Sequence, residues 1–172
     1  MLRGCLKLLE RFAVSMKNFA KLPVEDRKEV FQAVAGNMGL RPDIIEKDFW
    51  EKLTILNKLA FFPENKPLPS RYARHLYDVY CMANSQVKEA AFARKELLEK
   101  DIAFKQKFYY AKGAHYETAT LAEISLIPAD YIMDAVKQDY AAMKNMIYGE
   151  YPYFDDIIDC LTKLETEVHA LS

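Results

Sequence analysis

Residues 42–61 have the sequence PDIIEKDFWEKLTILNKLAF, and they predict the helix around which the fold is organised. Pro42 and Asp43 suit the first helical turn, where a missing N–H is harmless and an acidic side chain meets the positive end of the dipole. Apolar side chains then recur at helical spacing, at Ile45, Phe49, Leu53, Leu56, Leu59 and Ala60. This spacing indicates one buried face.

The rest of the chain shows the same helical periodicity. Further helices are predicted over residues 23–36, 70–83, 85–93, 97–110, 128–149 and 152–171. The chain has only 5 glycines and 7 prolines, and it contains no long alternating pattern typical of strands. The predicted fold class is therefore all-α: an irregular bundle of about seven helices with no substantial sheet. Residues 111–127 are the least decided segment, because TLAEISLIP suits either an extended stretch or a loop.

Two features concern the arrangement of these helices. The sequence FFPENKPLPS places three prolines between residues 63 and 69, which predicts a linker between a helical region at 1–62 and a helical domain at 70–172. The last helix carries a heptad pattern of apolar residues from Phe154 to Leu171. We expect this seam to pack on the preceding helix. The alternative is a surface for a partner helix.

Charge and cysteine content exclude several classes of protein. With 24 Lys+Arg against 25 Asp+Glu the net charge is −1, which gives no strong signal for nucleic acid and no pull toward an anionic membrane. Cys5, Cys81 and Cys160 are far apart and form no CxxC pair. They predict reduced thiols in a cytoplasmic protein.

The first residues, MLRGCLKLLERF, predict a surface helix rather than a signal peptide, because charged residues interrupt the leucines. A membrane-surface or targeting role and a true start at Met16 are the alternatives. No apolar run approaches the roughly 20 residues of a membrane span.

No familiar catalytic motif is complete. The three histidines stand apart without metal-ligand spacing, so no metal site is predicted. Arg71 and His75 are similar to the Arg–His pairs of helical ribonuclease modules, although their spacing is shorter. An ion pair between Arg74 and Asp78, four residues apart on one helix, is the simpler interpretation. The 11 tyrosines predict mainly core packing, with an aromatic surface for a partner or a base as the alternative.

Several segments together resemble the AbiEii/AbiGii nucleotidyltransferases, toxins of bacterial toxin–antitoxin and abortive-infection systems. The resemblance rests on the segments at 40–50, 49–57, 69–83, 103–117 and 126–165, in the family's order. The family places a large α/β core, with a Gly-Gly/Ser loop and an Asp-x-Asp pair, between an EKDFW-like element and an FWEKLTIL-like element. Here both elements are merged in EKDFWEKLTILN. This predicts an internal deletion joined near Phe49–Trp50.

The resemblance also implies site residues. Lys52 would meet the nucleotide phosphates, and Asp78 would orient that lysine or the nucleotide. Arg71 and Arg74 are further nucleotide-binding candidates, and Glu51 would support them. The alternative is that Lys52 and Asp78 are merely solvated or paired with each other.

The merged sequence predicts a protein without autonomous nucleotidyl transfer, because no Asp-x-Asp pair is present to hold metal. No cofactor is expected in this form, whereas an intact enzyme of the family would use Mg²⁺ and a nucleoside triphosphate. One alternative function is a helical interaction module that binds an antitoxin, a full-length toxin or itself. The other is an active enzyme with an unrecognised site.

Overall fold

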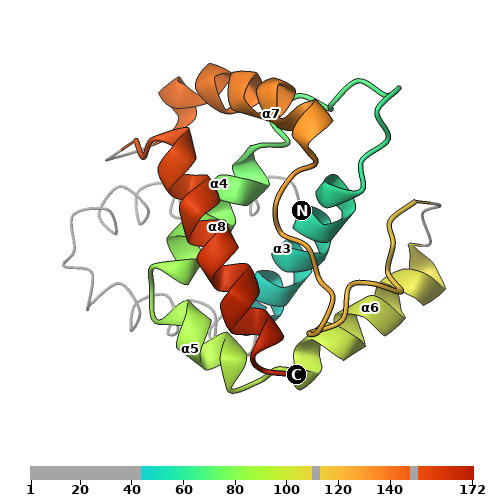
Figure 1. The fold of residues 1–172 in the computed structure, drawn as a ribbon. Helices are drawn as coiled ribbons and strands as arrows, with labels where there is room; N and C mark the ends of the chain where they lie inside the picture. The colour runs from blue at the N-terminus through green and yellow to red at the C-terminus, as the bar shows by residue number, and fades with distance from the viewer. Residues whose placement is uncertain (1–43, 110–112, 148–150) are drawn as a thin grey trace, which may run out of the picture. The chain divides into compact units, whose positions relative to one another are not determined.

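The computed structural model describes residues 44–109, 113–147 and 151–172 (Figure 1). Residues Ile45–Ser172 group into one compact unit, and the following account concerns this unit. The helix predicted over 23–36 and the surface helix predicted at the start of the chain lie outside the described residues, as does the predicted end of the helix over 128–149.

The described residues are helical and contain no strand, so the predicted all-α class is confirmed for this part of the chain. Six α-helices are present there: α3 (Ile44–Ala60), α4 (Arg74–Ala83), α5 (Val87–Phe92), α6 (Glu96–Phe108), α7 (Asp130–Ala142) and α8 (Phe154–His169). One short 3-10 turn, η1 (Lys144–Met146), follows α7. Each α-helix corresponds to a predicted one, with ends that shift by up to several residues.

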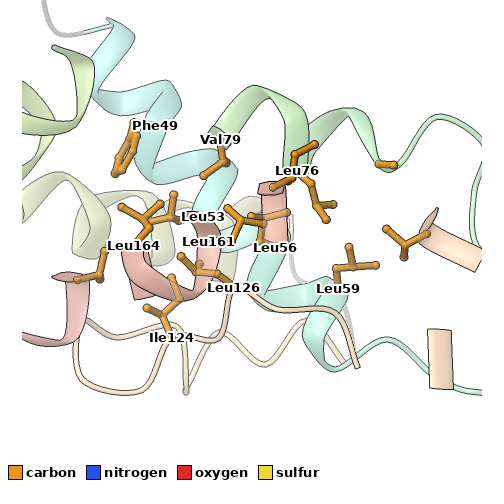
Figure 2. Packing of buried hydrophobic residues seen from close by; sticks show 14 of the residues in the cluster. Phe49, Leu53, Leu56, Leu59, Leu76, Val79, Ile124, Leu126, Leu161 and Leu164 are labelled. Carbon is orange, nitrogen blue, oxygen red and sulfur yellow. The ribbon is translucent and has the colours of Figure 1, made fainter. Parts of the chain in front are cut away.

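Helix α3 carries the centre of the core. Its predicted apolar face is buried, and Phe49, Leu53 and Leu56 have no exposed surface (Figure 2). Trp50 is equally buried, although it lies beside the predicted stripe. Its indole N–H donates to the carbonyl oxygen of Ala91 at 3.1 Å, and its ring stacks on Phe92 of α5 with centroids 6.2 Å apart. Helix α3 is therefore covered over a wider arc than its periodicity predicts.

Helix α8 buries its heptad seam, but its main neighbour is not the one predicted. Phe154, Ile157, Leu161, Leu164 and Val168 are all buried. The helix that packs most closely along α8 is α4 (Figure 1). The preceding helix α7 instead reaches the beginning of α8, where Tyr140 meets Phe154 with ring centroids 5.9 Å apart. The expectation that the seam packs on the preceding helix was therefore wrong.

The segment between α6 and α7 has no strand in its described residues, 113–127, yet it contributes to the core. Ile124 and Leu126 are fully buried and lie near Leu161 in Figure 2. Asn57 of α3, itself buried, holds the segment at two points. Its amide donates to the carbonyl of His115 at 3.1 Å, and its carbonyl accepts the N–H of Ser125 at 3.0 Å. This loop can be buried because the Asn57 side chain forms hydrogen bonds with backbone groups that would otherwise lack a partner.

The proline-rich connection at 63–69 runs from α3 to α4 and is exposed except at Leu68. Helix α4 begins at Arg74, four residues later than predicted. Just before it, Arg71 has a positive φ of 62°. Asp139 of α7 accepts the backbone N–H groups of Arg71 and Ala73 at 2.6 and 2.8 Å, so a side chain from another helix fixes the approach to α4. The division into regions 1–62 and 70–172 stays a prediction.

Among the described residues, no helix is long and apolar enough to cross a bilayer.

Candidate functional site

The two residues that the resemblance places in the site meet directly. Lys52 of α3 and Asp78 of α4 are 26 positions apart, and the lysine Nζ donates to the Asp78 Oδ2 at 2.7 Å. Their side chains are 18% and 39% exposed, so the pair lies at the edge of the core. Asp78 therefore pairs with Lys52 of α3. The sequence had predicted an ion pair with Arg74 of its own helix instead. The Lys52–Asp78 contact is expected both if Asp78 orients Lys52 and if the two residues only pair with each other.

His75 completes this cluster from one turn before Asp78. Its ring is buried, and its Nδ1 lies 3.4 Å from the Nζ of Lys52. Burial, followed by the nearby Lys52 ammonium, lowers the pKa of His75 from 6.5 to about 4. The ring is therefore neutral at pH 7, and with its proton on Nε2 it accepts a hydrogen bond from Lys52. Asp78 and His75 together hold the ammonium in place.

The lowered pKa of His75 predicts a loss of stability in acid. Between pH 6.5 and about 4 the unfolded chain takes up a proton that the folded chain does not bind. The stabilisation is complete above pH 6.5 and falls as the pH drops through this window, by about 2 kcal/mol after allowance for residual solvation. Urea titrations near pH 7 and near pH 4.5 measure the change. His75→Gln, which keeps an acceptor but does not titrate, should lose about 2 kcal/mol less on acidification.

His115→Asn is the matched control, because His115 is partly exposed and its φ of 48° suits asparagine. The acid loss that the His75 ring causes should persist in this variant. An identical acid loss in His75→Gln and in the unmodified protein would show that His75 does not carry the effect.

A second polar cluster joins α3 to α6. Asp101 is 3% exposed and accepts from Lys105 at 3.0 Å, four residues along the same helix. Lys105 also donates to the hydroxyl of Thr54 and to the carbonyl oxygen of Glu51, the latter at 3.3 Å. Sequence reasoning missed this cluster, because an Asp–Lys pair at this spacing looks like an ordinary exposed pair. Only the burial of Asp101 distinguishes it.

A cavity of about 410 Å³ opens beside these two clusters. Its charged groups are Lys47, Glu51 and Lys58 of α3 with Asp101 and Lys105 of α6. Its aromatic lining comes from Tyr72, Phe104, Tyr109 and Tyr116. His75 also lines it and so connects the cavity to the Lys52–Asp78 pair, whereas Lys52 itself is not a lining residue. The arrangement offers cations and rings around a space that fits a small ligand or a few side chains.

The two arginine candidates lie at the beginning of α4. Arg71 is exposed and is held through its backbone N–H by Asp139. Arg74 is the first residue of α4, is exposed, and contributes to the lowered pKa of His75 through its charge. Neither arginine lines the cavity. The structure therefore brings Lys52, His75 and Asp78 into contact, and Arg71 and Arg74 do not take part in that contact.

The described residues do not fit a magnesium site. Magnesium requires several oxygen ligands, usually including carboxylates. Asp78 and Asp101, the carboxylates of the two clusters, already bind lysine ammonium groups. Within residues 44–109, 113–147 and 151–172, no group of three or more His, Cys, Asp or Glu side chains is placed to hold a metal ion. We therefore assign no metal-dependent step to these residues.

Comparison with known proteins decides the family. A family model described as "Nucleotidyl transferase AbiEii toxin, Type IV TA system" matches residues 45–160, more than half of the chain. The chain belongs to the AbiEii toxin family. The AbiEii match includes Lys52, His75 and Asp78, so the candidate cluster lies wholly within it. No curated protein and no solved structure matches the chain.

Proposed function

We propose that this AbiEii-family chain acts in a bacterial toxin–antitoxin or phage-defence system, in the cytoplasm, and does not transfer nucleotidyl groups by itself. The observation that supports the proposal best is the match of residues 45–160 to the AbiEii toxin family, a stretch in which Lys52 and Asp78 lie 2.7 Å apart. Two residues implicated by the family resemblance form one cluster with His75, which favours a retained part of a nucleotide site.

The chemistry explains why this cluster is insufficient alone. Nucleotidyl transfer needs an attacking group in line with the α-phosphate and carboxylates that hold Mg²⁺ against the developing charge. The sequence contains no Asp-x-Asp pair for this purpose. Asp78 is engaged by Lys52, so a phosphate that approaches Lys52 competes with a carboxylate already in place. We therefore expect any nucleotide contact at Lys52 to be weak.

A transfer assay tests this proposal. The purified chain is incubated with nucleoside triphosphates labelled at the α-phosphate, with Mg²⁺ and with tRNA, and label in the RNA is measured. We expect no transfer above the level of Lys52→Ala. Lys66→Ala is the control, because Lys66 is exposed in the proline-rich connection. Transfer that persists in Lys66→Ala and disappears in Lys52→Ala would overturn the proposal.

A second candidate function is an interaction module that binds an antitoxin, a full-length toxin or another copy of itself. Three neighbouring rings at the end of α6, Phe104, Phe108 and Tyr109, are exposed by 46%, 61% and 66%, which favours this candidate. Light scattering over a concentration series tests self-association. A mass that stays monomeric throughout would exclude the self-binding form.

A further inference from the structure

The end of α6 carries the aromatic patch, formed by Phe104, Phe108 and Tyr109. The ring centroids of Phe104 and Phe108 are 5.0 Å apart, and those of Phe104 and Tyr109 are 5.7 Å apart. Helix α6 lies at the edge of the described unit in Figure 1. Single exposed apolar residues are common on protein surfaces, but contiguous exposed rings are typical of a binding surface.

The rim of the aromatic patch is positively charged. The Nζ of Lys47 lies 5.6 Å from the centroid of Phe104, and that of Lys107 lies 5.2 Å from the centroid of Phe108. Neither lysine belongs to an ion pair within the described part of the chain. Two ammonium groups beside apolar rings therefore remain available to anionic groups of a partner.

The aromatic patch continues into the cavity. Phe104 and Tyr109 belong to the patch and also line the cavity, together with Ile55 and Tyr116. The cavity is therefore a recess of mixed lining, in which these rings and Ile55 lie beside charged groups. A partner that inserts one large apolar side chain would bury surface in the recess and place its neighbouring groups at the lysines. Such anchors carry much of the affinity of protein interfaces.

The charges distinguish between two classes of partner. Lysines beside aromatic rings suit nucleic acid, where phosphates and bases alternate. Glu51, however, also lines the cavity, between Lys47 and Lys58 along α3, and the whole chain has a net charge of −1. A continuous phosphate backbone would meet repulsion at Glu51. A peptide carries carboxylates only where its sequence has Asp or Glu, so it can avoid placing one at Glu51. Its backbone N–H groups can also donate hydrogen bonds to the Glu51 carboxylate.

We propose that the aromatic patch and the adjoining cavity bind a peptide segment of a partner protein, with a large apolar side chain flanked by Asp or Glu. This inference rests on the interaction-module candidate and names the chemistry of its partner. Its test is separate from that of the nucleotide-site proposal, because none of the residues substituted below belongs to the cluster of Lys52, His75 and Asp78, although His75 also lines the cavity.

Selection from a displayed library of random peptides tests the inference with the full chain as target. The selected peptides are then measured by fluorescence anisotropy against variants. We expect acidic peptides with an aromatic or leucine anchor to be enriched. Their affinity should fall at least roughly tenfold for Phe104→Ala/Phe108→Ala and for Lys47→Glu/Lys107→Glu, since both the anchor and the charge pairing are lost. Circular dichroism checks that these exposed substitutions preserve the fold.

Tyr153→Ala is the matched control, because Tyr153 is an aromatic side chain outside the patch that is 79% exposed. Its affinity for the selected peptides should be unchanged. Enrichment of basic or uncharged peptides, failure to enrich any peptide, or equal binding to the Phe104→Ala/Phe108→Ala variant would each overturn the inference. So would single-stranded RNA that binds more tightly than the peptides and loses affinity in the same double variant.

Discussion

Replacing Trp50 by alanine is expected to lower the free energy of unfolding by about 4 kcal/mol. The side chain is fully buried, and its loss leaves a cavity between α3 and α5. It also removes the hydrogen bond from the indole to the carbonyl of Ala91, which is 3.1 Å long. A buried acceptor left without its partner adds to the cost of the cavity.

Urea unfolding followed by circular dichroism measures this loss, since Trp50 is the only tryptophan and the variant lacks its fluorescence. Trp50→Phe keeps a ring but loses the hydrogen bond, so it should cost about 2 kcal/mol. Tyr153→Ala, a substitution of an exposed ring, should change the free energy by about 0.5 kcal/mol or less. A loss below about 1 kcal/mol for Trp50→Ala would show that α5 does not cover this part of the core.

Trp50 also shows how far periodicity predicts this fold. The positions of Phe49, Leu53 and Leu56 follow from helical spacing, and all three are buried. Trp50 lies beside that stripe and is buried because α5 packs against this side of α3. Such a contact between helices cannot be predicted from the spacing of apolar residues within one helix. The same limit explains α8, whose seam was predicted correctly while its neighbour was not. Sequence spacing identifies a buried face but not the element that covers it.

The candidate site was predictable only in part. Lys52 and Asp78 could be selected through the family resemblance, but they are 26 positions apart and nothing in the sequence between them places their charged groups at 2.7 Å. His75 was considered as a metal ligand or as a nuclease residue, whereas its contact with Lys52 depends on how α3 and α4 pack. The two hydrogen bonds that the Asn57 side chain makes to the backbone of residues 115 and 125 were likewise not predicted. In the sequence, Asn57 is one polar position on a helix, and nothing marks it as buried.

Replacing Lys105 by methionine is expected to lower the free energy of unfolding by about 3 to 4 kcal/mol. Lys105 lies 3.0 Å from Asp101, whose side chain is 2% exposed, so the substitution leaves a buried carboxylate without its cation. The hydroxyl of Thr54 lies 3.4 Å from Asp101 and cannot neutralise that charge. Denaturant titration of the variant against the unmodified chain measures the loss.

The double variant Asp101→Leu/Lys105→Met tests whether the unpaired Asp101 carboxylate causes the loss in the free energy of unfolding. If the large loss in Lys105→Met comes from the stranded carboxylate, the double variant should recover about 2 kcal/mol or more of it, because both charges are then absent. Lys88→Met is the control: it breaks the exposed pair with Glu167, whose side chain is 45% exposed, and should cost about 1 kcal/mol or less. A double variant no more stable than Lys105→Met would assign the loss to the hydrogen bonds that the ammonium group donates to Thr54 and to the carbonyl oxygen of Glu51, because methionine keeps most of the apolar stem of lysine. The cluster would then stabilise the junction of α3 and α6 through these hydrogen bonds rather than by neutralising Asp101.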